Sequence, residues 1–104
     1  MKLDERVYKE LCRVPRGKVT TYGALARAVG LPNGQRIIGR IMKNNPYPGI
    51  VPCHRVVRSD GKVGGYSPGG MSGGEMIKSA MLEKEGIGIS GGKIRDLDGS
   101  LFEF

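Results

Sequence analysis

Residues 52–57 place a thiol directly before the only histidine of the chain, in the order Pro-Cys-His-Arg-Val-Val. A thiolate is a strong nucleophile once a neighbouring base has removed its proton, so Cys53 is a candidate nucleophile and His54 a candidate base. Adjacent side chains often point apart, and the pair alone is equally compatible with a packing accident. The elements around Cys53 and His54 must therefore decide whether this is a reactive site.

The composition predicts a single domain with one strongly basic part. A chain of 104 residues suits one modest core. Residues 1–63 hold thirteen Lys/Arg and four Asp/Glu, whereas residues 64–104 hold four and six, giving net charges of +9 and −2. A polyanion is one natural partner for such a basic surface, and a simply solvated basic face is the other interpretation.

The two cysteines predict neither a disulfide nor a metal site. The first six residues are charged, and no apolar run follows them as in a signal peptide or a membrane span. We therefore expect a cytoplasmic protein in which Cys12 and Cys53 stay reduced. One histidine and two distant cysteines cannot complete a tetrahedral zinc site.

Three helices are expected in the first half. The first is indicated by apolar residues spaced by four and three: Leu3, Val7, Leu11 and Val14. Cys12 lies beside this stripe and is expected to be a small core or boundary residue. Thr21 can cap a second helix over 22–29, which ends at Gly30.

A third helix over 35–42 follows a Pro-Asn-Gly turn and carries Arg36, Arg40 and Lys43 on its polar face. Two short helices joined by such a turn, the second one basic, resemble a helix-turn-helix. Extended residues at 50–51 and 56–58, an Asp-Gly turn and Val63 then predict a hairpin. The expected fold class is mainly α with short β-hairpins, a winged-helix-like three-helix domain.

The remainder of the chain is expected to hold one more helix and a small hairpin. Glycine dominates residues 61–74, a composition typical of a flexible loop or of a backbone that approaches a ligand closely. A helix is predicted over 75–85, ended by Gly86, and a hairpin over 87–97. The residues expected to face inward from the last helix are Met76, Ile77, Ala80, Met81 and Leu82.

Several ordered motifs together resemble the catalytic, DNA-binding domain of the O6-alkylguanine-DNA alkyltransferases. The hexapeptide at 52–57 matches the active-site signature of that family, and the resemblance covers residues 1–86, leaving 87–104 as a tail. The other matching motifs are Gly17-Lys18-Val19, Thr21-Tyr22, the helix from Arg36 to Met42, Asn45-Pro46, Gly65-Tyr66-Ser67, and Lys78 with Leu82 and Glu85-Gly86.

The resemblance implies a catalytic group of Cys53, His54, Glu85, Tyr22 and Asn45. Cys53 would accept the alkyl group irreversibly, so that one chain repairs one lesion without a cofactor. His54, through a water molecule, would act as its base, and Glu85 would orient the imidazole. Glu85 alone would otherwise be read as a charge near a helix end.

The resemblance also implies how the damaged base is held. Tyr22 would donate to the guanine N3, the Ser67 amide would meet O6, and Tyr66 would pack against the base. The carbonyls of Cys53 and Val56 would accept from the exocyclic amine. Without the resemblance, each tyrosine would be read as a half-buried aromatic residue with a solvated hydroxyl.

The implied partner is double-stranded DNA containing O6-alkylguanine, bound by a monomer through the minor groove. Arg36 would replace the flipped nucleotide, Gly39 would allow close approach, and Arg40 and Lys43 would contact phosphates. Asn45 would connect the recognition helix to the cysteine segment.

Three features depart from the family pattern and keep alternatives open. A further domain usual in the family is not in the sequence, the loop around 68–74 is about five residues longer than expected, and the tail has only a loose counterpart. Leu101, Phe102 and Phe104 are expected to cover the surface of the absent domain or to contact a partner. Alkyltransferase-like proteins bind the lesion without repairing it and lack the cysteine, so Cys53 argues against that alternative. A winged-helix regulator with an incidental Cys-His pair is the third interpretation.

Overall fold

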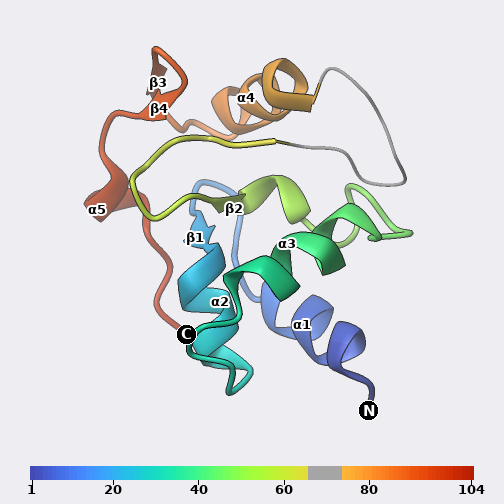
Figure 1. The fold of residues 1–104 in the computed structure, drawn as a ribbon. Coiled ribbons are helices and arrows are strands. Elements are labelled where there is room, and N and C mark those ends of the chain that lie inside the picture. The colour runs from blue at the N-terminus through green and yellow to red at the C-terminus, as the bar shows by residue number, and fades with distance from the viewer. Residues whose placement is uncertain (66–73) are drawn as a thin grey trace.

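The computed structural model describes residues 1–65 and 74–104. Three helices pack together at one end of the molecule: α1 (Leu3–Leu11), α2 (Tyr22–Ala28) and α3 (Gln35–Lys43) (Figure 1). Helix α4 (Gly74–Lys84) lies at the other end with the antiparallel hairpin of β3 (Ile89–Ser90) and β4 (Lys93–Ile94). None of the described helices is long and apolar enough to span a membrane.

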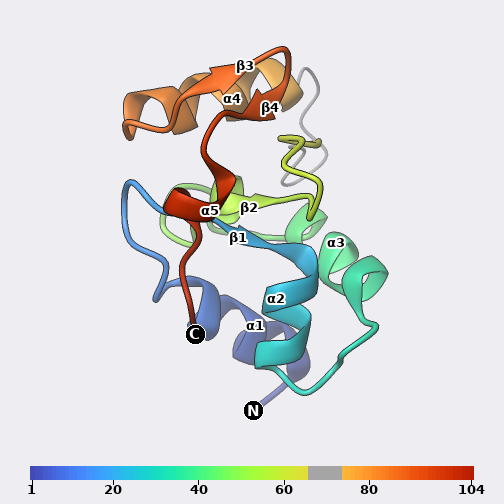
Figure 2. The ribbon, with the colours of Figure 1, turned by 90° about the vertical axis from the view of Figure 1, so that its left-hand side faces the viewer.

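A two-stranded parallel sheet lies between these two ends. Strand β1 (Thr20–Thr21) pairs with β2 (Val56–Val57), and a short 3₁₀ helix, η1 (Cys53–Arg55), immediately precedes β2. Helix α5 (Leu97–Ser100) then leads the C-terminal segment back along β1 towards α1 (Figure 2). The predicted helical fold and the terminal hairpin are confirmed, whereas α5 had no counterpart in the sequence analysis.

The helix-turn-helix is formed by α2 and α3. The Thr21 hydroxyl accepts a hydrogen bond from the Ala24 amide at 3.1 Å, as an N-cap should. The chain leaves α2 at Gly30, whose φ of +81° suits glycine and few other residues. Ile38 and Met42 lie one turn apart on α3 and bury its apolar face in the core. The basic residues of the opposite face, Arg36, Arg40 and Lys43, are exposed.

The hairpin predicted after Arg55 is wrong in its pairing. The turn forms, because the Gly61 amide donates to the Arg58 carbonyl and the Arg58 amide to the Lys62 carbonyl. Val63, however, donates to the Gly92 carbonyl, and β2 pairs with β1 instead. Val56 and Val57 point to opposite faces and are both fully buried, so β2 needs an interior position that a solvent-facing wing does not provide.

The inward face of α4 also differs from the prediction. Met76 is 84% exposed, Ile77 and Ala80 are exposed, and Met81 is only partly buried. The fully buried positions are Lys78 and Leu82, one turn apart. The prediction assigned only apolar side chains to the inward face and therefore did not include Lys78.

The C-terminal residues pack on their own domain. The Val19 amide donates to the Ser100 carbonyl and the Phe102 amide to the Val19 carbonyl, so this segment runs parallel to β1. The rings of Phe102 and Phe104 meet edge to face, with centroids 5.1 Å apart, and the Arg13 guanidinium lies over both. Cys12 is exposed rather than part of the core, which corrects the expectation for that residue.

Two adjacent threonines provide a test of the cap. Thr21→Val removes the capping oxygen and should lower the free energy of unfolding by about 1 kcal/mol. That loss corresponds to a fall in Tm of about 4–8 °C. Thr20→Val is the matched control, because the buried Thr20 hydroxyl has no hydrogen-bond partner among the described residues and its removal should leave stability equal or higher. Thermal denaturation measures both, and equal losses would contradict the capping role.

Candidate active site

Cys53 and His54 lie on η1, at the boundary between the helical end and α4. Both are nearly inaccessible, with exposed fractions of 4% and 3%. Pro52 limits the conformations available before the 3₁₀ turn, and the buried strand β2 holds the turn from the other side. The candidate nucleophile and base are therefore fixed by the core rather than carried on a surface loop.

The Glu85 carboxylate binds the two residues that follow Cys53. His54 Nε2 lies 3.0 Å from Glu85 Oε2, and Arg55 donates to both carboxylate oxygens, at 2.9 Å from Nε and 2.7 Å from Nη2. Arg55 Nη1 also donates to the Val14 carbonyl at 2.8 Å. Sequence reasoning paired Glu85 with His54 and missed Arg55, although a bidentate arginine is the most effective partner for a buried carboxylate.

Burial favours a neutral imidazole at His54, although Glu85 acts in the opposite direction. Burial by itself raises the pKa of Glu85, but the hydrogen bonds and positive charges of Arg55 and His54 outweigh it and lower the pKa to about 2. Burial lowers the pKa of His54 below its ordinary 6.5, and Glu85 offsets only part of that effect. His54 is therefore neutral at pH 7 and able to accept a proton.

The hydrogen bond to Glu85 also selects the tautomer of His54. A carboxylate only accepts, so Nε2 carries the hydrogen and Nδ1 keeps its lone pair. Nδ1 is buried and has no hydrogen-bond partner among the described residues. It is the basic atom of the site.

Tyr22 and Lys78 bring an aromatic ring and a buried amine to the same region. Burial raises the pKa of Tyr22, and Cys53 adds to this when its sulfur is a thiolate. Lys78 Nζ lies 5.7 Å from the centre of the Tyr22 ring and donates to the Gly65 carbonyl at 3.3 Å. Burial lowers the pKa of Lys78 to about 8, although Glu75, and Cys53 as a thiolate, favour its protonated form.

Lys78 is the functional candidate that sequence reasoning did not assign. It was quoted only as part of a motif, without a role. Its spacing of four residues from Leu82 on a helix was the available signal, because a lysine at an apolar position of a stripe is rarely fully buried without a partner. Its ammonium places positive charge near Cys53.

Asn45 connects the end of α3 to the segment before Cys53. Its side-chain amide donates to the Val51 carbonyl at 3.0 Å, and its side-chain oxygen accepts from the Tyr47 amide at 2.9 Å. Asn45 is 1% exposed, so these bonds replace the water that would otherwise satisfy it. A shift of α3 would therefore move the backbone two residues before Cys53.

A groove of about 610 Å³ opens between α2, α3 and the turn after β2. Arg36 and Gly39 line it together with Tyr22, whereas Arg40 and Lys43 do not. A side chain at Gly39 would meet nothing within 4 Å, so the protein's own packing does not require glycine there. The remaining lining residues are Gly23, Gln35, Arg58 and Ser59.

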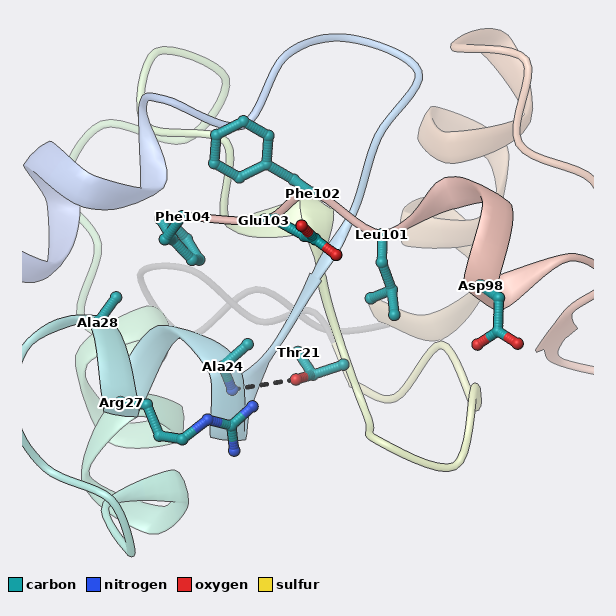
Figure 3. A pocket seen from close by; sticks show the side chains of 9 residues that line it. All are labelled: Thr21, Ala24, Arg27, Ala28, Asp98, Leu101, Phe102, Glu103 and Phe104. Atoms are coloured by element: carbon teal, nitrogen blue, oxygen red, sulfur yellow. Dashed lines mark hydrogen bonds between the residues drawn. The ribbon is translucent and has the colours of Figure 1, made fainter.

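A second cavity, of about 640 Å³, lies between α2 and the C-terminal segment (Figure 3). Its lining includes Arg27, Phe102, Glu103 and Phe104, but no cysteine, histidine or residue predicted for the site. It therefore offers neither a thiol nor an imidazole, and the candidate active site is the region of Cys53. Val56 lies in the core beside Cys53, and the predicted roles of Tyr66 and Ser67 fall outside the described residues.

The described residues contain no group of three or more His, Cys, Asp or Glu side chains that could hold a metal. The arrangement instead provides a thiol, a neutral base with a fixed tautomer and a buried ammonium. These are the groups that nucleophilic transfer to sulfur requires.

The Glu85 network should make stability depend on pH in acid. Because folding lowers the pKa of Glu85 from 4.5 to about 2, its contribution is complete above pH 4.5 and is lost as the pH falls through about 2. The loss should be on the order of 3 kcal/mol. Urea denaturation across this range should show a flatter profile for Glu85→Gln. Glu83→Gln, an exposed neighbour on α4, should keep the parent profile; a flat parent profile would contradict the network.

Comparisons with known proteins identify relatives of this chain. A rat methylated-DNA–protein-cysteine methyltransferase is 42% identical over 81 residues, which cover 78% of this chain and 37% of the relative. Crystal structures of fission yeast Atl1 with DNA containing O6-carboxymethylguanine and of Mycobacterium tuberculosis OGT with DNA superpose with TM-scores of 0.82 and 0.75. Their identities to this chain are 36% and 38%.

The extent of the match differs between these relatives. The Atl1 comparison covers 100% of both chains, whereas the mycobacterial comparison covers 83% of this chain and 49% of that one. This chain thus spans less than half the length of the two methyltransferases. The family model described as the DNA-binding domain of 6-O-methylguanine DNA methyltransferase matches residues 2–87, and the chain therefore belongs to that family.

Proposed function

We propose that this chain repairs O6-alkylguanine in double-stranded DNA by transferring the alkyl group to Cys53. The observation that carries the proposal is the buried hydrogen bond between His54 Nε2 and Glu85, directly beside Cys53. That bond leaves His54 Nδ1 as the basic atom next to a cysteine. The coupled groups are thus a nucleophile, a base and a residue that orients the base.

The transfer is a displacement at carbon. His54, through a water molecule, takes the proton of the Cys53 thiol, and the sulfur attacks the alkyl carbon. The bond between that carbon and O6 breaks, and its electron pair stays on guanine, where the Tyr22 hydroxyl donates a hydrogen bond to N3. The proton taken up by His54 is returned through water to the guanine anion, so the thiol proton ends on the repaired base. The product is a thioether on Cys53, which no group of the site can cleave, so the chain reacts once. No cofactor takes part.

The Lys78 ammonium supports this direction of charge flow. Before transfer, the negative charge is on sulfur, and the buried cation interacts favourably with it. During transfer the charge moves to guanine, beside Tyr22, whose ring also lies near Lys78. Because one buried cation lies near both groups, it can stabilise the negative charge on sulfur and then on guanine without a rearrangement of the site.

Binding of the lesion requires that the base leaves the duplex. The groove next to Tyr22 is lined in part by Gly23 and Gly39 and has an exposed arginine, Arg36, at the start of α3. Arg36 would fill the space of the extruded nucleotide, Gly39 would allow α3 to approach the minor groove, and Arg40 and Lys43 would contact phosphates. The carbonyls of Cys53 and Val56 would accept from the guanine amine.

Lesion binding without repair is the second candidate. It is favoured by the full-length likeness to Atl1, whose crystallised complex contains damaged DNA. The two candidates share the fold and the groove, and they differ in whether Cys53 takes up the alkyl group.

Intact-protein mass distinguishes the two candidates. After incubation with a duplex containing O6-methylguanine, the parent chain should gain one methyl group that peptide mapping locates on Cys53. Cys53→Ser should gain none and still prefer the lesion, because the groove is unchanged. Cys12→Ser, which alters the exposed second cysteine, should be methylated like the parent. Preferential binding of the lesion by the parent without any mass gain would reject repair and support lesion binding.

Arg36 can be tested by comparing duplex DNA with a free base. Arg36→Ala should slow methyl transfer from duplex DNA more than reaction with free O6-benzylguanine, since the free base needs no extrusion from a stack. Rapid-quench kinetics on both substrates gives the ratio. Arg40→Ala, one turn further along α3 and outside the groove lining, should change that ratio less. Equal losses for Arg36→Ala on both substrates would remove Arg36 from base flipping.

A further inference from the structure

Arg58 reaches the groove because of the register of the parallel sheet. Thr21 pairs with Val57, so the residues that follow them, Tyr22 and Arg58, leave the strand pair at the same end. Both line the groove, together with Ser59. Arg36 enters from α3 and Arg58 from the end of β2, so two guanidinium groups approach one groove from separate elements.

The local backbone holds Arg58 in this position. Its amide and carbonyl are both used by the turn, in bonds of 3.0 Å to Lys62 and 2.9 Å from Gly61. A Cβ added to Gly64 would lie 3.6 Å from Arg58 Cγ and 3.8 Å from Cδ, which shows that the aliphatic part of the side chain lies against this glycine. The side chain is nevertheless 56% exposed, so the guanidinium remains accessible.

Asp60 is the ion-pair partner of Arg58 in the described structure. Arg58 Nη2 lies 3.3 Å from Asp60 Oδ2, and the Asp60 side chain is 44% exposed. Asp60 Oδ1 also accepts from the Lys62 amide at 3.0 Å, which keeps the carboxylate on the turn. An exposed pair of this kind contributes little, about 0.2–1 kcal/mol, so a better anion can replace it.

We propose that Arg58 binds a backbone phosphate of DNA at this groove and that Asp60 competes with that phosphate for the guanidinium. The proposal rests on the proposed function, because it takes DNA as the ligand. A phosphate is the matching anion, since guanidinium binds it bidentately and the first 63 residues carry a net charge of +9. The loop after β2 thereby extends the DNA-binding surface beyond the helix-turn-helix and contains an internal competitor.

Salt-dependent binding to an undamaged duplex oligonucleotide tests this, because such DNA cannot alkylate Cys53. Arg58→Gln should weaken binding and reduce the slope of log Kd against log salt by about 0.9, the value of one phosphate contact. Asp60→Asn should tighten binding by about two- to fivefold, the factor that corresponds to loss of an exposed ion pair. In the Arg58→Gln background, Asp60→Asn should give no such gain.

The ion pair of Arg13 and Glu10 provides a matched control, because it lies outside the groove lining. Its Arg13 Nη1 and Glu10 Oε2 atoms are 2.7 Å apart. Glu10→Gln makes the same change in net charge as Asp60→Asn and should tighten binding less. An unchanged salt slope for Arg58→Gln would overturn the phosphate contact. An equal gain from Asp60→Asn with and without Arg58 would overturn the competition. If one of these two results is obtained and the parent chain still transfers methyl groups, only the inference about Arg58 and Asp60 fails. If the parent chain does not bind DNA, the proposed function is rejected as well.

Discussion

The Glu85 carboxylate is the interaction on which the rest of the site depends. It accepts hydrogen bonds from His54 and twice from Arg55, and Arg55 reaches on to the Val14 carbonyl. Three distant segments are thereby joined: the end of α1, the turn that carries Cys53, and the end of α4. Removal of Arg55 would leave the Glu85 carboxylate without its cation, and loss of one partner from a buried ion pair costs about 3–5 kcal/mol. The same bonds that hold α4 on the domain also fix the tautomer of the base.

The parallel pairing of β1 with β2 determines which groups face the candidate substrate. Because Thr21 pairs with Val57, the start of α2 lies beside Arg58, at the opposite end of β2 from the turn that carries Cys53. Val56 packs in the core cluster of the three helices, and Val57 packs in the cluster under α4 and the terminal hairpin. Cys53 therefore sits where two cores meet, and small movements of either end would change its surroundings.

Three side chains share the electrostatics of the site: the cations of Arg55 and Lys78 and the neutral imidazole of His54. Arg55 compensates Glu85, so His54 does not need to be charged. Lys78 is left to act on the groups around Tyr22 and Cys53. The exposed arginines of the groove differ from these two cations, since their side chains are accessible to an anion from solvent.

The sequence by itself determined the features that depend on neighbours in the chain. The cap at Thr21, the exit at Gly30 and the order of the three helices follow from local hydrogen bonding and apolar spacing, and the hexapeptide around Cys53 identifies the family. Only the tertiary structure decided the pairing of β2, the burial of Lys78 and the contact between Arg55 and Glu85. Strand partners and buried ion pairs join residues about 30 or more positions apart, and local spacing does not encode such distances. The proposed chemistry depends on these long-range contacts, because they place the candidate nucleophile of a common Cys-His sequence beside an oriented candidate base.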